Sequence, residues 1–288
     1  SELVHEFEDT GYAEEWFNKL WNGINIDNKD IISNYIDNWK RIPSARLNHR
    51  PKPLIKHPLD LIRDGHPKNW AGYVDALREC NDYWDNDGGH FSVLESERSY
   101  LDTIITGRNV ILRKSWLDLS KEENNILLAF RKDSHSQGAW GLLGSMKGAG
   151  RAVGTFLTDA DTRQIIQKSL VPVLESQSEE DFIIAAITTI ETIAQLDGFG
   201  PAIATRLIAL ARPDRGISIN KGSSPALAEL TGLPASVNTL SNTKNYPKLL
   251  RWVYNQPWYR CDEPDDSFER TIWAIRAAII DSFVYRYI

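Results

Sequence analysis

The chain has 288 residues, of which 42% are hydrophobic and 25% charged, and its formal net charge is −6. This composition is typical of a globular protein with one or two domains, and no apolar run reaches the roughly 18 residues that span a membrane. The acidic balance argues against a protein that binds nucleic acid over its whole surface, although a local basic face is sufficient to bind phosphate.

The N-terminal part of the sequence alternates between helical patterns and proline-rich loop. Residues 10–24 (TGYAEEWFNKLWNGI) and 29–42 (KDIISNYIDNWKRI) place apolar side chains at helical spacing. Prolines then favour a loop over 42–69, and the helical pattern returns over 70–84. We interpret residues 1–119 as an irregular helical extension of unknown role that could contact a protein partner.

A basic stretch lies within this extension. Residues 40–57 hold six Lys or Arg and no Asp or Glu. The stretch is either a solvated, proline-stiffened loop or an arm that lies on a phosphate backbone.

The signals for helices become stronger from residue 120 onward, and we expect a helical domain over 120–288. Ser120 with Glu123, and Ser178 with Asp181, have the spacing of capping residues at helix starts. A glycine-rich segment over 134–154 separates these two positions, and a helix is expected over 159–174. The last segment, 267–288, carries an apolar stripe and is expected to form one long core helix.

The stretch LDGFGPAIATRL, residues 196–207, predicts a tight turn between two helices. Gly198 and Gly200 permit a turn that residues with a Cβ would resist, and Pro201 suits the first position of the second helix. Leu196 and Phe199 are apolar residues that would hold the turn to the core. The turn's N–H groups and the positive end of the second helix would suit an anion.

This stretch resembles the helix-hairpin-helix motif of a DNA glycosylase superfamily, in a form similar to the 8-oxoguanine glycosylases. The resemblance continues after the second helix, where GISIN (216–220) matches a short β-like segment and Ser224 and Gly232 would begin and end the next helix. It covers residues 180–235 well and extends in outline over 120–288. It implies a mostly α, bilobal helical fold.

The resemblance also implies double-stranded DNA as the partner, with or without a flipped base. The residues expected to contact DNA lie in the hairpin, in the glycine-rich segment and after the second helix: Gly198, Phe199, Gly200, Ala202, Arg206, Lys147, Arg151 and Ser223. Trp258 and Tyr259 would line a pocket for a flipped base, or alternatively fill the interface between the lobes.

Two positions depart from the family's pattern. Asn220 stands where the family has a catalytic Asp, and Ala202 stands where its lyase members have a nucleophilic Lys. Lys221, next to Asn220, is the candidate for relocated chemistry, if nearby Arg206, Arg212 and Arg215 lower the pKa of its amine; otherwise it contacts phosphate. If Lys221 is not the nucleophile, Glu269 and Asp281 are the next acids to consider.

Three hypotheses follow. The first is a glycosylase-like enzyme that excises a damaged or modified base. The second is a catalytically silent DNA-binding subunit of a repair or anti-phage system, and the third is a helical adaptor. The histidines form no ligand cluster, so neither metal nor cofactor is expected. Two cysteines, and an N-terminus without an apolar segment, lead us to expect a cytoplasmic protein without a membrane segment.

Overall fold

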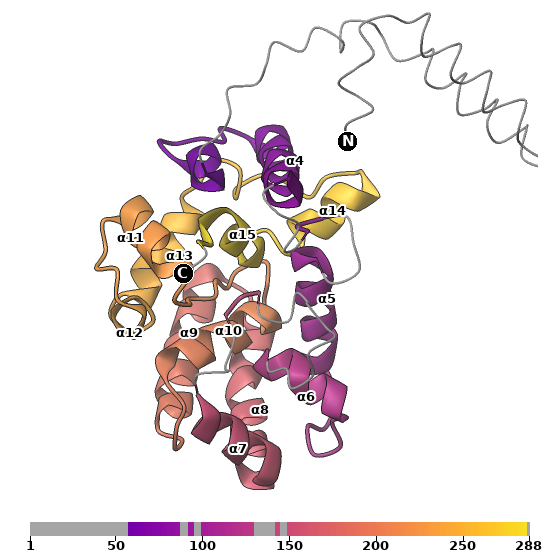
Figure 1. Cartoon of the computed structure of the whole chain (residues 1–288), viewed down its shortest axis with the longest axis vertical. Coiled ribbons are helices and arrows are strands. Elements are labelled where there is room, and N and C mark those ends of the chain that lie inside the picture. Colours follow the sequence, from indigo (N-terminus) through magenta and orange to yellow (C-terminus); the bar gives the residue numbers. More distant parts are fainter. Residues whose placement is uncertain (1–56, 87–91, 95–98, 130–141, 145–148, 287–288) are drawn as a thin grey trace, which may run out of the picture. The chain divides into compact units, whose positions relative to one another are not determined.

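The computed structural model describes residues 57–86, 92–94, 99–129, 142–144 and 149–286 (Figure 1). The chain divides into two units, Ser1–Leu54 and Ile55–Ile288, and the described residues all belong to the second. The boundary that the sequence suggested near residue 120 therefore falls inside one compact unit. The basic stretch over 40–57 lies outside the described residues except for His57.

Helices account for the regular structure of the described residues, which contain no strand, so the prediction of a mostly α fold is confirmed. The division into two lobes stays a prediction. None of these helices is long and apolar enough to cross a bilayer. With the labels of Figure 1, the elements are η3 (Pro58–Ile62), α4 (Trp70–Asn86), α5 (Tyr100–Ile111), α6 (Lys121–Leu128), α7 (Gly150–Thr158), α8 (Ala160–Glu175), α9 (Glu179–Ala194), α10 (Pro201–Ala211), α11 (Ser224–Thr231), α12 (Val237–Leu240), α13 (Tyr246–Tyr254), α14 (Ser267–Trp273), η6 (Ala278–Ile280) and α15 (Asp281–Val284).

Side-chain caps fix where several helices begin. Ser120 and Glu123 form a reciprocal capping box at the start of α6, and Ser178 and Asp181 form another at the start of α9. Each pair satisfies two N–H groups that have no partner within the helix. Both capping predictions are therefore confirmed, and Asp159 caps α8 in a similar way.

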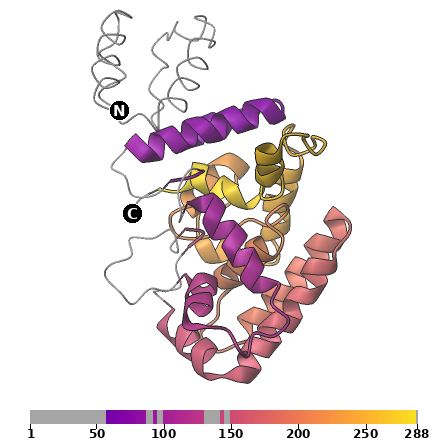
Figure 2. The same ribbon diagram turned by 90° about the vertical axis from the view of Figure 1, so that its right-hand side faces the viewer.

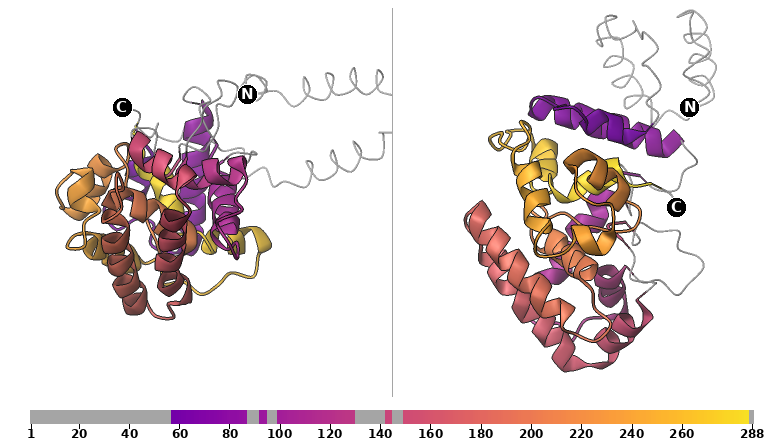
Figure 3. Two further views of the ribbon diagram at one scale, coloured as in Figure 1. Left: turned by 90° about the horizontal axis from the view of Figure 1, so that it is seen from below. Right: turned by 90° about the vertical axis from the view of Figure 1, so that its left-hand side faces the viewer.

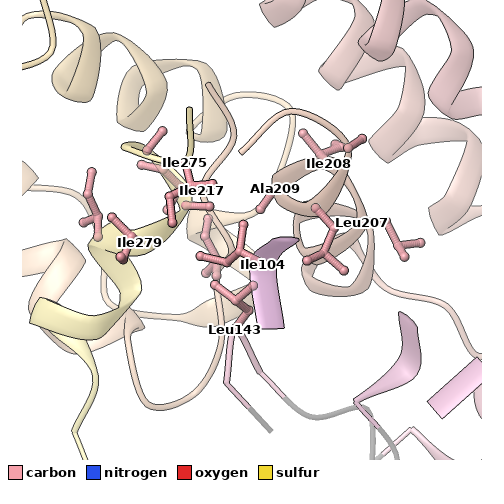
Figure 4. Packing of buried hydrophobic residues seen from close by; sticks show 14 of the residues in the cluster. Ile104, Leu143, Leu207, Ile208, Ala209, Ile217, Ile275 and Ile279 are labelled. Carbon is pink, nitrogen blue, oxygen red and sulfur yellow. The ribbon is translucent and has the colours of Figure 1, made fainter. Parts of the chain in front are cut away.

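Helix α10 is the centre of the described unit. It packs against α8 and α9 and also against α5 (Figure 1). Residues 204–211 are all buried, including Thr205 and Arg206, so this part of α10 is covered on every side. Leu207, Ile208 and Ala209 of α10 join a core that also contains Ile104 of α5 and Ile279 of η6 (Figure 4).

The first and last parts of the described unit pack together. Helix α4 lies beside the C-terminal elements (Figures 2 and 3). The Tyr73 hydroxyl donates to the Arg276 carbonyl at 2.8 Å, and the Trp84 indole N–H donates to the Ser282 carbonyl at 2.9 Å. Helix α4 is thus part of the same core as the last residues.

The single long helix expected over 267–288 was a wrong prediction, because this segment forms α14, η6 and α15 instead. The N–H groups of Ala277 and Ala278 both donate to the Pro213 carbonyl, at 3.1 and 2.9 Å. These bonds replace helical bonds to the preceding turn, so the helix is interrupted after Trp273. The interruption turns Asp281 towards the interior of the unit, where it is fully buried.

Candidate functional site

The turn between α9 and α10 has the conformation that the sequence predicted. Gly198 has a φ of +81°, in the left-handed region that favours glycine. The Phe199 N–H donates to the Leu196 carbonyl at 3.0 Å, which closes the turn. Phe199 is 6% exposed, so this apolar residue does hold the turn to the core, and Pro201 begins α10 as expected.

The backbone donors of this turn are available to a ligand. Within the residues described, no protein acceptor receives the N–H of Gly198, Gly200 or Ala202. Gly200 is the N-cap of α10 and has no side chain to occupy these donors. Gly198 is exposed and Pro201 is half-buried, so solvent reaches this end of α10.

Arg151, at the start of α7, lies beside the turn. A Cβ on Gly198 would come within 2.7 Å of the Ala152 nitrogen and 3.1 Å of the Arg151 Cβ. The Arg151 guanidinium pairs with Asp197 at 3.1 Å, and both side chains are mostly exposed, at 74% and 67%. Such an exposed pair contributes little to stability, so the cation can exchange its partner for a phosphate. Lys147, the other basic residue expected here, lies outside the described residues.

The segment after α10 leads into a buried polar cluster. Residues 216–220 are buried and form no strand, although a β-like segment was expected. The Ile217 N–H and carbonyl both bond the Tyr246 hydroxyl, and the Ile219 N–H donates to the Thr205 hydroxyl at 3.1 Å. Side chains therefore satisfy the backbone that a neighbouring strand would satisfy in a sheet.

Asn220 ends this segment, and its carboxamide is turned inward. The Asn220 Nδ2 donates to Asp281 Oδ1 at 2.8 Å, and its Oδ1 accepts the Ser223 N–H at 3.0 Å. The Ser223 hydroxyl accepts the Asn220 N–H at 3.1 Å and is fully buried, so it is not placed to contact a phosphate. Helix α11 begins at Ser224 with Ser223 as its N-cap, one residue earlier than expected. It ends at Thr231, and Gly232 is its C-cap, as predicted.

Asp281 is the acid of this cluster, and the sequence identified it only as a reserve candidate. Its Oδ2 accepts the Tyr100 hydroxyl at 2.9 Å and the Leu143 N–H at 3.2 Å. Burial raises the pKa of Asp281 above its ordinary value, while the hydrogen bonds from Tyr100 and Asn220 act in the opposite direction. The cluster thus joins α5, α15 and the segment after α10 around one carboxyl group.

Arg206 does not face DNA, which corrects its assignment as a phosphate contact. It is 2% exposed, and its guanidinium donates to the carbonyls of Ile126 and Leu127 at 3.0 Å. It also donates to the carbonyls of Leu142 and Gly144. Burial lowers the pKa of Arg206 to about 10, and the nearby charge of Asp281 opposes that effect. Arg206 therefore holds the end of α6 to the 142–144 segment.

Lys221 follows Asn220 and is exposed. The arginines expected to act on it are engaged elsewhere. Arg212 pairs with Asp214 at 2.8 Å and donates to the Ser176 carbonyl. Arg215 donates to the carbonyls of residues 177 and 178. The structure therefore does not bring these guanidinium groups to Lys221.

Trp258 and Tyr259 fill space rather than line an open pocket. They are 1% and 4% exposed, and the Trp258 ring stacks on Tyr73 with 4.0 Å between ring centroids and 7° between ring planes. The Arg276 guanidinium lies 4.6 Å from the centroid of the Tyr259 ring. A base would have to displace these partners, so the geometry supports the alternative that the two residues fill an interface. Glu269 accepts the Trp70 indole N–H at 2.8 Å, whereas the Asn220 side chain bonds Asp281 and Ser223.

Comparison of the chain with family models, curated proteins and solved structures finds no match.

Proposed function

We propose that the chain binds double-stranded DNA through the turn between α9 and α10. The observation that supports this most strongly is the exposed turn itself, in which the N–H groups of Gly198, Gly200 and Ala202 have no acceptor among the described residues. Donors that converge at a helix N-terminus bind anions, and a phosphate supplies the acceptor oxygens that this turn lacks.

The turn is a better candidate than the three arginines that follow it in the sequence, Arg206, Arg212 and Arg215. Arg206, Arg212 and Arg215 are committed to carbonyl or carboxylate partners inside the protein. Arg151 is exposed next to the turn and would add one positive charge to the contact. A contact of a few phosphates through backbone donors is compatible with a net charge of −6, because binding depends on the local field.

The test uses Gly200→Asp. Nothing lies within 4 Å of a Cβ at Gly200, so the side chain fits, and Asp is a favourable N-cap that would accept the free N–H groups. We expect the free energy of unfolding to stay level or rise by up to about 1 kcal/mol. The Kd for a fluorescein-labelled 20-base-pair duplex, measured by anisotropy, should rise about tenfold or more, because the donors are occupied and a negative charge is added.

Thr188→Asp is the matched control, because Thr188 is exposed on α9 before the turn and the substitution adds the same charge. It should change the Kd much less than Gly200→Asp does. Wild-type affinity should fall as the salt concentration rises. Equal affinities for wild type and Gly200→Asp would show that the turn is not the contact, and no binding to any duplex would favour the adaptor hypothesis.

Base excision is a second candidate function, supported by a specific observation. Asp281 places a carboxyl group next to Asn220, and Lys221 is exposed beside it. Duplexes carrying altered bases would be incubated with the protein and examined for abasic sites and for borohydride-trapped complexes. If Lys221 is the nucleophile, Lys221→Ala removes the trapped complex and leaves the fold intact.

The catalytically silent alternative rests on different features of the same region. The Asn220 carboxamide is committed to Asp281 and Ser223, and Ala202 offers no nucleophile. DNA binding without product from any altered base would favour this alternative.

A further inference from the structure

His57 joins the first element of the described unit to its last residues. Its Nδ1 accepts the Leu59 N–H at 3.1 Å and so caps η3, while its Nε2 lies 3.0 Å from the Tyr285 carbonyl oxygen. A backbone N–H can only donate and a carbonyl can only accept, so Nδ1 must be unprotonated and Nε2 must carry the hydrogen. The two bonds therefore exist together only when the ring is neutral and in this one tautomer.

The surroundings of the ring favour its neutral form. His57 is half-buried, and its ring meets the rings of Tyr83 and Trp84 of α4 edge-on, with ring centroids 6.0 and 6.1 Å apart. Burial lowers the pKa of His57 from its ordinary value of 6.5, while the bond to Tyr285 acts in the opposite direction. Aromatic side chains, and not water, thus cover much of the group that would take up the proton.

We propose that the two bonds of His57 form a pH-sensitive latch between η3 and the C-terminal segment, residues 285–286, which opens when the ring is protonated. A proton on Nδ1 would place one N–H against the Leu59 N–H, so two donors would meet and the cap would be lost. Element η3 spans only Pro58–Ile62, and its start depends on that cap. This proposal does not rest on the proposed function.

Charged groups from three parts of the chain lie near the ring. Asp60 of η3 and Glu229 of α11 favour the protonated ring, whereas Arg286 opposes it. Glu229 is itself paired with Arg286, at 3.1 Å. The remaining titratable groups beside the ring are the phenols of Tyr83 and Tyr285. Carboxyl, guanidinium and phenol groups ordinarily titrate well away from pH 6, so a transition in that range identifies the imidazole.

Opening of the latch would also affect the turn before α11. A Cβ on Gly222 would come within 2.6 Å of the Tyr285 ring, and the Arg286 N–H donates to the Gly222 carbonyl at 3.0 Å. Gly222 directly follows the exposed Lys221. The C-terminal segment therefore contacts both η3 and this turn, and it can transmit a change at His57 from one to the other.

The pH range of opening follows from the lowered pKa of His57. The released ring has the ordinary pKa of 6.5, and the ring in the latch has a lower one. The released form therefore binds the proton first as pH falls. The equilibrium constant for opening should rise by up to about tenfold for each pH unit below 6.5, until the lowered pKa is reached. Above this range the latch stays closed and the constant levels off.

Hydrogen–deuterium exchange of the full-length chain tests the proposal, measured by mass spectrometry between about pH 5 and pH 8 and corrected for the intrinsic pH dependence of amide exchange. Peptides that contain residues 57–64 and 281–286 should exchange faster as pH falls below the ordinary pKa of histidine. A peptide from α10 should show no such change. Equal acceleration in α10 would mean that the whole unit opens, and would overturn the proposal.

Two variants each keep one half of the latch without a group that titrates. In His57→Asn the short side chain can still cap η3, and in His57→Gln the longer one can still donate to the Tyr285 carbonyl. Both should lose the dependence of corrected exchange on pH. His66→Gln is the matched control, because His66 is exposed in the same unit, and it should behave as wild type does.

A pH dependence that persists in both His57 variants would overturn the proposal, as would its absence from wild type. A measurement on the wild-type chain alone covers the case in which neither variant folds. With ¹⁵N-labelled histidine, the ring nitrogens of His57 should show the tautomer with the hydrogen on Nε2 at neutral pH and should titrate below the ordinary pKa. The opposite tautomer, or titration at or above the ordinary pKa, would rule the latch out.

Discussion

Gly198 and Gly200 look alike in the sequence, but the structure gives them different roles. Gly198 has a φ of +81°, and a Cβ there would lie 2.7 Å from the Ala152 nitrogen. Gly200 has a φ of −115° and open space around it, so the fold itself does not require glycine there. What glycine provides at 200 is an unobstructed approach to the donors of α10.

Gly198→Ala should therefore lower the free energy of unfolding by about 1–3 kcal/mol, through backbone strain and the clash with α7. Gly200→Ser should change it by less than about 1 kcal/mol and in the stabilising direction, because Ser is a good N-cap. Urea denaturation followed by circular dichroism measures both. A Gly198→Ala variant as stable as wild type would contradict the turn geometry.

The limit of sequence-based prediction is clear at Asn220. Its place after α10 could be read from the order of motifs, but its bond to Asp281 joins residues 61 positions apart. No local pattern encodes that contact, because it depends on the break between α14 and η6. An Asp at position 220 would therefore meet a second carboxylate, that of Asp281. Arg206 was misassigned for a related reason, because its acceptors are carbonyls of distant segments.

At the level of elements, local signals predicted the ends of several helices, although α5, α7, α12 and α13 were not predicted. The two capping boxes, the Asp159 cap and Gly232 at the end of α11 all depend on residues within one turn of the helix. The prediction for the terminal segment was wrong because the N–H groups of Ala277 and Ala278 bond the Pro213 carbonyl instead of carbonyls of the preceding turn. The periodicity of apolar residues gives no sign of such a bond. Trp258 and Tyr259 could be recognised as aromatic residues on a loop, but not as partners of α4 and Arg276.

The capping box of α9 gives a test with a defined pH dependence. The hydrogen bonds from Ser178 lower the pKa of Asp181 below its ordinary value. The stabilisation from Asp181 is therefore present above the unfolded-state pKa and is lost as pH falls through the lowered pKa.

Ser178→Ala should lower the free energy of unfolding by about 1 kcal/mol at pH 7, and by less as the pH is lowered towards 3. Thermal melts between pH 3 and pH 7 would measure this, with Thr188→Ala as an exposed control on the same helix. A cost that does not depend on pH would mean that the Ser178 hydroxyl does not influence the Asp181 carboxylate, whose bond from the Ser178 backbone N–H the substitution leaves in place.

On the scale of the whole molecule, the unit Ile55–Ile288 contains the whole core described above. A fragment of residues 55–288 should therefore keep the helical circular dichroism of that unit and unfold in a single transition. If the basic stretch over 40–57 acts as an arm on DNA, the fragment should bind a duplex more weakly and with a smaller dependence on salt than the full chain does. Equal affinities would identify the stretch as a solvated loop. An unfolded fragment would show that residues 1–54 belong to the core.

The packing of α4 on the last residues has a consequence for how the protein is made. Tyr73 and the Arg276 carbonyl that it bonds are 203 residues apart in the chain. At about 5–20 residues per second, translation takes roughly 10–40 seconds to pass from one to the other. Until then, the Tyr73 hydroxyl and the Trp84 indole N–H lack the carbonyls of Arg276 and Ser282 that later accept their hydrogen bonds. Helix α4 can pack on η3 as soon as both are made, but its contacts with the C-terminal elements form only after the segment beyond residue 267 has emerged.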